Sequence, residues 1–131
     1  MQTLVAAGLL VASLAVVALL VWDDTPAPAA GEHALLVLGP HGAIFDGTGV
    51  GATPYAVLLQ AAAGNFEVES QGKGDTAFVT AIDGQRNQGA AGWCYAVDAG
   101  DGWVYPQVGA GAYSLELGVR VLWTYQSQGC P

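Results

Sequence analysis

The sequence predicts a small α+β domain in which one short helix packs on a mixed or antiparallel sheet, with an apolar segment ahead of it. Short runs of alternating apolar and polar residues are separated by glycine-rich turns, which is the pattern of strands in a sheet. A single stretch, from Thr53 to Ala63, instead repeats its apolar residues with helical spacing. A chain of 131 residues has room for one such domain and its accessory segments.

The first segment of the chain is apolar enough to cross a membrane. Residues Leu4 to Trp22 carry no charge, and a helix of this length spans about 28 Å, close to one hydrocarbon core. A cleaved signal peptide usually has a shorter apolar region and a basic start, although Ala27 and Ala29 provide the small residues of a cleavage site. Residues 1–22 are therefore expected to be a transmembrane anchor or a signal segment.

The boundaries of the spacer and of the domain are predicted from the change in composition after the apolar segment. Residues 23–33 are expected to form a Pro/Ala-rich spacer without a core of its own, and residues 34–131 the domain. Since the spacer begins with two aspartates, we place the domain on the extracytoplasmic side. The expected location is the cell envelope, with the domain membrane-anchored, or secreted if the first segment is cleaved.

The domain is expected to begin with a hairpin from Ala34 to Phe45, in which Gly-Pro-His-Gly forms the turn. The helix follows, with Thr53 as its N-cap and Pro54 at its first position. Its apolar stripe is predicted to be Tyr55, Leu58, Leu59 and Ala62.

The second half of the domain is predicted to consist of strands. They are expected at residues 66–70, 77–83, 93–98 and 119–125, with a flexible connector at 84–92. The aromatic side chains of the last two strands alternate with other residues, so that they share one face and pack under the helix. These aromatic residues are Trp93, Tyr95, Trp123 and Tyr125.

The charge of the chain excludes several classes of function. The formal net charge is −8, and the basic residues are Lys73, Arg86 and Arg120. Nucleic acids and anionic lipid headgroups both require clusters of cations, so neither is an expected partner. We expect no cofactor.

Catalytic and metal motifs are also missing from the sequence. The histidines are His33, in the spacer, and His41, in a turn, and no serine lies in a G-x-S-x-G elbow. Asp98 and Asp101 lack the twelve-residue calcium pattern and indicate a solvated turn. The domain is therefore expected to be neither an enzyme nor a metal site.

"GTGVGA", from Gly47 to Ala52, matches the G-x-G-x-x-A outline of a dinucleotide-binding turn. The strand before it and the helix after it are both short, and the rest of the chain is typical of antiparallel hairpins. A glycine loop that leads into a capped helix is the preferred interpretation.

Cys94 and Cys130 both follow the apolar segment, and in an exported chain one disulfide is the simplest explanation. A bridge over this separation would stabilise the domain by about 3.8 kcal/mol through lost chain entropy. A reactive thiol or a metal pair would be the alternatives, but neither has a nearby histidine or a C-x-x-C spacing in its favour.

The loop from Asp98 to Ala110 is the candidate binding segment. Trp103 and Tyr105 lie there between glycines and a proline, where burial of an aromatic ring is harder to arrange than on a strand. Either they contact a ligand or partner, or they fold back over a sheet edge. The candidate binding residues of this loop are Asp98, Asp101, Trp103, Tyr105 and Gln107.

Five blocks of sequence together resemble the transcobalamin-like C-terminal domain family. They are "AVLLQAAAGNFEVESQG", "AFVTAIDG", "NQGAAGWCYAV", "GAGAYSL" and "GVRVLWTY". The resemblance implies a β-grasp fold, and a corrinoid as one ligand, because in the vertebrate cobalamin carriers this domain closes over one face of the corrin. The chain departs from the family at Asp98, where Asn is usual, in a longer turn after it, and at Val119, where Asp is usual.

Two hypotheses of function follow. In the first, the domain is a non-enzymatic, extracytoplasmic ligand-binding or interaction module, which contacts a ligand, a surface protein or a glycan through its aromatic loop. In the second, it binds cobalamin, another corrinoid or a different small molecule together with a partner domain. The first is preferred, since the sequence offers few polar residues for a closed pocket.

Overall fold

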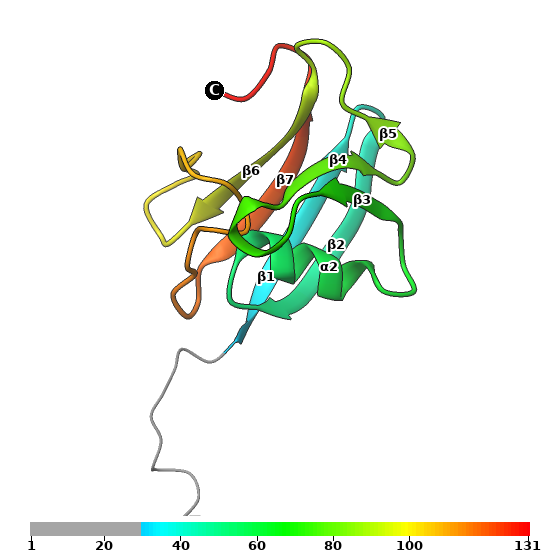
Figure 1. Ribbon diagram of the computed structural model, residues 1–131. Helices are drawn as coiled ribbons and strands as arrows, with labels where there is room; N and C mark the ends of the chain where they lie inside the picture. The colour runs from blue at the N-terminus through cyan, green and yellow to red at the C-terminus, as the bar shows by residue number, and fades with distance from the viewer. Residues whose placement is uncertain (1–29) are drawn as a thin grey trace, which may run out of the picture.

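The computed structural model describes residues 30–131 (Figure 1). The expected anchor or signal at residues 1–22 and most of the expected spacer lie outside the described residues. Within residues 30–131, no helix is both long enough and apolar enough to span a membrane.

Four strands form a mixed sheet, sheet A, in the order β2-β1-β7-β6. They are β1 (Gly31–Gly39), β2 (Gly42–Gly51), β6 (Gly92–Asp98) and β7 (Arg120–Gln126). β1 pairs with β2, and β6 with β7, in antiparallel fashion, whereas the central pair of β1 and β7 is parallel. β1 starts at Gly31, so that His33 belongs to this strand, where it is buried and its Nδ1 lies 2.7 Å from the carbonyl oxygen of Val119.

A second, antiparallel sheet, sheet B, consists of β3 (Val68–Gln71), β4 (Phe78–Ile82) and β5 (Gln85–Arg86). A short 3₁₀ helix, η1 (Gly74–Thr76), joins β3 to β4. The expectation of one sheet was wrong, because the strands form two. Part of the segment expected as a flexible connector at 84–92 is a strand, since Gln85 pairs with Ile82 and Arg86 with Ala81. The coarse prediction of an α+β domain with one α-helix is confirmed for the described residues.

The helix α2 (Pro54–Ala62) begins as the sequence predicts. The hydroxyl of Thr53 accepts the N–H of Ala56 at 3.1 Å, and Pro54 occupies the first turn. The buried stripe differs from the predicted one: it consists of Pro54, Val57, Leu58, Ala61 and Ala62. Leu59 is 40% exposed, because the helix is apolar on several sides and its contact with β2 selects the face.

The glycines of "GTGVGA" belong to a strand and not to the expected loop. Gly47, Gly49 and Gly51 lie in β2, and the last two are buried directly beneath α2. A Cβ atom at Gly49 would lie 2.5 Å from the carbonyl oxygen of Val57, and one at Gly51 would lie 2.7 Å from the Val57 nitrogen. The glycines therefore allow the helix backbone to approach the sheet, which is a packing role.

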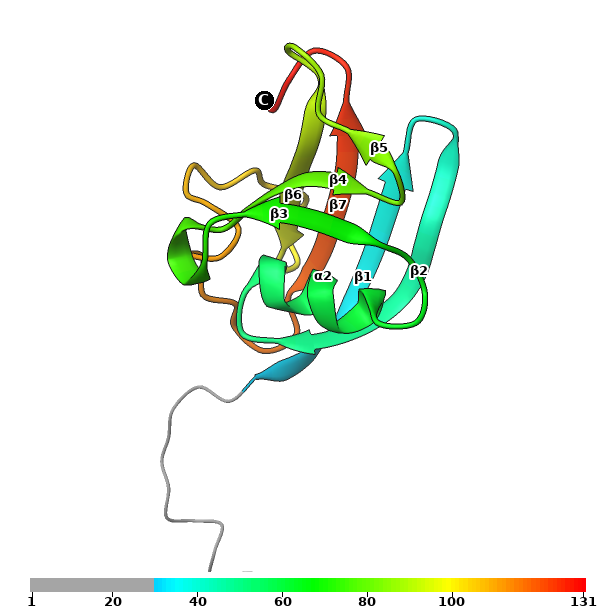
Figure 2. The same ribbon diagram turned by 45° about the vertical axis from the view of Figure 1, so that its right-hand side comes forward.

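The core lies between sheet A and a layer formed by α2 and sheet B (Figure 2). We call this covered side of sheet A its front face, and the opposite side its back face. Side chains from all three units meet in the core, among them Leu35, Leu58, Ile82, Trp93 and Trp123. Tyr95 and Tyr125 are half-buried against the same cluster, so the expected aromatic face is confirmed.

Candidate ligand-binding site

Residues 99–119, between β6 and β7, contain most of the candidate binding residues, and we call them the crossing loop. Val104 exchanges two backbone hydrogen bonds with Val97, each of 2.9 Å, which fixes the loop to the outer edge of β6. Further along, the carbonyl oxygen of Ala110 accepts the N–H of Tyr55 at the start of α2. The loop thus passes from the back face of sheet A, around the β6 edge, to the front face.

Asp98 organises the start of the crossing loop. Its Oδ1 accepts the N–H groups of Gly100 and Gly102 at 2.7 and 3.0 Å, and its Oδ2 pairs with the guanidinium of Arg120. The hydrogen bond from Arg120, followed by that from Gly100, lowers the pKa of the Asp98 carboxyl below its usual value, although burial opposes the shift. The Asp98 side chain is only 5% exposed, and its oxygen atoms accept hydrogen bonds from the turn and from Arg120.

Trp103 lies on the back face beside this ion pair. The guanidinium of Arg120 is 4.9 Å from the centroid of the Trp103 ring, which is a cation–π contact. The ring lines a small cavity of about 140 Å³ that also contacts Leu36 of β1 and Asp46 of β2. Trp103 is 39% exposed, so it is partly folded back onto the sheet. Asp101, at the tip of the turn, is exposed.

The contacts of Asp98 give a prediction about pH. Asp98→Ala should destabilise the domain more than Asp98→Asn, because the amide oxygen can still accept the Gly100 and Gly102 N–H groups whereas alanine cannot. The wild type should be more stable than Asp98→Asn at neutral pH. Since the folded-state pKa is lowered, this advantage is present above the unfolded pKa of about 3.9 and lost as the pH falls through the lower folded value.

Urea unfolding of the three proteins at a series of pH values measures these differences. The difference in free energy of unfolding between wild type and Asp98→Asn should decrease towards zero as the pH is lowered. A difference that stays constant into strong acid would contradict the ion pair as its source.

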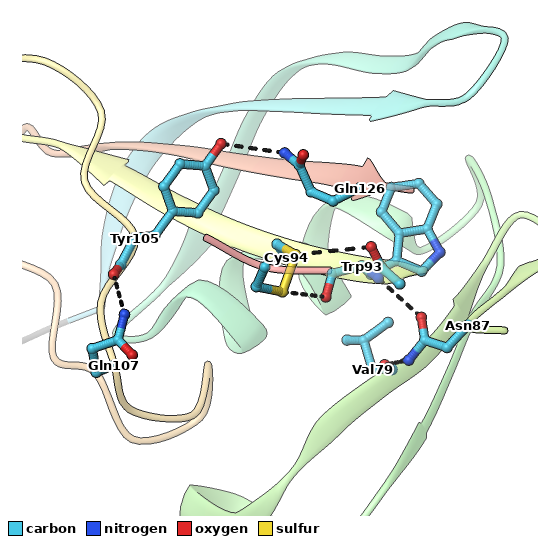
Figure 3. Close-up of a disulfide and its surroundings, with 9 residues drawn as sticks. Val79, Asn87, Trp93, Cys94, Tyr105, Gln107 and Gln126 are labelled. Carbon is cyan, nitrogen blue, oxygen red and sulfur yellow. Dashed lines mark hydrogen bonds between the residues drawn. A yellow bond between two sulfur atoms is a disulfide. The ribbon is translucent and has the colours of Figure 1, made fainter. Parts of the chain in front are cut away.

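Tyr105 and Gln107 lie apart from Trp103, near the disulfide (Figure 3). The hydroxyl of Tyr105 is 3.4 Å from Nε2 of Gln126, and the Nε2 of Gln107 donates to the Tyr105 carbonyl oxygen at 3.2 Å. Tyr105 is half-buried and Gln107 is exposed. The structure thus places Asp98 with Trp103 in one group, and Tyr105 with Gln107 in another.

Cys94 and Cys130 form a disulfide, as the sequence predicts, with their Cα atoms 5.5 Å apart. The bridge holds the end of the chain beside β6, and the Sγ of Cys130 lies 3.8 Å from the Trp93 carbonyl oxygen (Figure 3).

A cavity follows the outer edge of β6, and we call it the edge pocket. Its volume is about 340 Å³. β4 and β6 supply Phe78, Val79, Trp93, Cys94 and Tyr95, β7 supplies Trp123, and the crossing loop supplies residues 105–110. Asn87, Cys130 and Pro131 complete the lining, so that no Asp, Glu, Lys or Arg side chain takes part.

Tyr95 forms the central wall of the edge pocket. Its hydroxyl donates to the carbonyl oxygen of Val108 at 2.5 Å and lies 3.4 Å from that of Gly109, which ties the crossing loop to the sheet. Burial, with a further contribution from Tyr113, raises the pKa of Tyr95 to about 12. The phenol therefore stays neutral at physiological pH and remains a donor.

The edge pocket is lined by residues that sequence reasoning assigned differently or did not single out. Trp93, Tyr95 and Trp123 were expected in the core, and they do pack there, but each also lines the pocket. Phe78 and Val108, which are 49% and 50% exposed at its rim, had no assigned role. Exposed apolar residues beside an aromatic wall are suited to contact with an uncharged, partly apolar ligand.

The described residues contain no cluster of three or more His, Cys, Asp or Glu side chains that could hold a metal ion. The edge pocket presents aromatic faces, two amide side chains and the hydroxyl groups of two tyrosines.

No curated protein matches this sequence. A family described as Domain of unknown function (DUF4430) matches residues 56–127, from α2 to the end of β7, which is 72 of the 131 residues. The match includes the crossing loop and nearly all of the edge pocket, and leaves out the β1–β2 hairpin. The chain therefore belongs to the DUF4430 family.

Proposed function

We propose that the domain is a non-enzymatic, extracytoplasmic binding module, which takes an uncharged and partly apolar group of its ligand or partner into the edge pocket. The observation that carries this proposal is the uncharged, aromatic lining of a cavity of about 340 Å³, within the range of small-ligand sites. The Cys94–Cys130 disulfide supports an oxidising compartment, which agrees with export of the chain.

We further propose a β-grasp fold related to the transcobalamin-like domains. The support is the order of the elements: a β1–β2 hairpin, the helix α2 packed on it, and a last strand β7 that lies parallel to β1 in the middle of the sheet.

A corrinoid or other small molecule bound together with a partner domain is the alternative. A volume of about 340 Å³ is at the lower end for a site that encloses a small ligand. A corrin ring would therefore place only one edge or side chain in the pocket, and a partner domain would have to cover the rest.

The proposal is tested by titrating the isotope-labelled full chain, held in lipid nanodiscs because Leu4 to Trp22 are apolar, with phenyl glucoside and, separately, with cobalamin. Binding in the edge pocket should shift the backbone NMR signals of Val79 and Ala110, which line it. Shifts at these residues with phenyl glucoside support the general module, and shifts with cobalamin alone support the corrinoid alternative.

Two variants of the crossing loop provide the matched control. Val108, at the rim, and Val104, outside the lining, are 50% and 57% exposed. Val108→Glu places a charge at an apolar entrance and should weaken binding at least about tenfold, whereas Val104→Glu should leave it unchanged. Equal loss in both variants, or no response of the pocket signals to either probe, would overturn the proposal.

A further inference from the structure

At Tyr95, the outer edge of β6 carries a backbone donor and an acceptor that the fold does not use. In an antiparallel pair, alternate residues direct their N–H and C=O groups to the partner strand, and the others direct them outward. Val97 directs both groups outward, to Val104, so Tyr95 and Trp93 must also face away from β7. The N–H of Trp93 points outward as expected, since it donates to Oδ1 of Asn87 at 2.9 Å.

Tyr95 lies between Trp93 and Val97 on this edge, and it lines the edge pocket. Among residues 30–131, no hydrogen-bond partner reaches its backbone N–H or C=O. Open backbone groups on a strand edge are able to pair with a further strand. Asn87 on one side and Val104 on the other limit the open length of the edge to about three residues.

One residue of an extended peptide can hydrogen-bond to both the N–H and the C=O of Tyr95. Its own N–H and C=O are spaced to exchange both bonds with Tyr95, as Val104 does with Val97 two residues away. Residues directly opposite each other in an antiparallel pair direct their side chains to the same face. The side chain opposite Tyr95 would thus enter the front part of the pocket, near Phe78 and Val108.

The charges of the domain indicate what should flank that residue. Residues 30–131 contain nine Asp or Glu and three Lys or Arg, a formal charge of −6. Both arginines are already paired, Arg86 with Glu69 and Arg120 with Asp98. The pocket has no charged side chain and favours an uncharged residue at its centre, and the net negative charge of the domain favours basic residues beside that one.

A second copy of the chain fits this edge poorly. Its own β6 edge is bordered by the same crossing loop, so two such edges would bring both loops into one space. A short, separate peptide segment brings no second crossing loop.

We propose, on the basis of the binding function proposed above, that the edge pocket binds an extended peptide segment by adding it to β6 at Tyr95. The bound segment has an aromatic or large aliphatic residue opposite Tyr95, with basic residues on either side. Recognition by the backbone of Tyr95 makes the site selective for a peptide over ligands that lack consecutive amides.

The test uses the same full-chain sample and the peptide acetyl-Lys-Phe-Lys-amide. Its Phe should exchange bonds with Tyr95, so the Tyr95 amide proton should move downfield and exchange more slowly with solvent. The same peptide with phenyllactate in place of phenylalanine lacks the N–H that donates to Tyr95 and should bind about 3- to 10-fold more weakly. Acetyl-Glu-Phe-Glu-amide should also bind more weakly, and this difference should shrink at high salt.

The outcomes separate this inference from the proposed function. Binding of the peptide with pocket signals shifted, but with the Tyr95 amide unmoved and the phenyllactate analogue equally tight, would overturn strand addition alone. Binding of phenyl glucoside or diacetylchitobiose without binding of the peptide would overturn it as well, and would leave a glycan-binding pocket. A pocket that responds to none of these probes would overturn both proposals.

Discussion

Replacing Cys94 by alanine and Cys130 by serine together is expected to lower the free energy of unfolding by about 3–4 kcal/mol. The bridge closes a sequence separation of 36 residues, which contains most of β6, the crossing loop and β7, and it restricts the unfolded chain accordingly. Alanine is chosen at Cys94 because this side chain is buried, and serine at Cys130 because it is exposed. For a domain of this size, the loss is a large part of the total stability.

Urea unfolding of the oxidised wild type and the double variant measures the loss. Reduction should destabilise the wild type by a similar amount and leave the variant unchanged, which controls for effects of the substitutions themselves. Wild-type protein recovered from cells under denaturing conditions should show no thiol that can be labelled before reduction. Free thiols in that sample would contradict both the bridge and the extracytoplasmic location.

Leu58→Ala is expected to destabilise the domain by about 2–5 kcal/mol, whereas the same change at Leu59 should cost less than about 1 kcal/mol. Leu58 is fully buried between α2 and the sheets, and its truncation leaves a cavity. Leu59, the next residue of the helix, is 40% exposed and loses little contact. The two variants have the same chemistry and the same change in helix propensity, so each is the control for the other.

Equilibrium unfolding of both variants against wild type gives the two differences in free energy. Equal losses would mean that α2 is rotated from the orientation described, with the stripe that includes Leu59 turned towards the core.

The elements that could be predicted from the sequence are those that depend on neighbouring residues. The cap at Thr53 and the proline after it fix the start of α2, and alternation identifies most strands, because side-chain direction follows the local backbone. The orientation of α2 could not be predicted from its periodicity. A helix with leucines at 58 and 59 and alanines around them has two plausible apolar stripes, and only packing against Gly49 and Gly51 selects one.

The glycines of β2 show the limit of turn chemistry as a guide. Three glycines in five residues indicate a loop when only neighbouring residues are considered. Here, Gly49 and Gly51 have ordinary strand backbone. They are needed because α2 packs so closely on them that a side chain would not fit.

The candidate site was predicted only in part, because it is assembled from distant segments. The aromatic residues of the crossing loop were recognised, but the partner of Asp98 is Arg120, across the sheet, and the wall of the edge pocket comes from β4, β6 and β7. Tyr95 could be assigned to a strand from its pattern. That its backbone faces an open edge depends on the order of strands in the sheet, which local sequence does not specify.

The parallel pair at the centre of sheet A also governs when the domain can assemble. β1 is the first strand of the described chain and β7 is the last, and the residues that they pair are separated by 86 positions, as in the pair of Leu35 and Val121. A polypeptide that emerges from a translocation pore with its amino end first would present β1 and β2 long before β7 arrives. During that interval the free edge of β1 has no partner strand, and closing so long a loop is slow compared with local steps. Any factor that shields emerging chains would therefore meet this hairpin first.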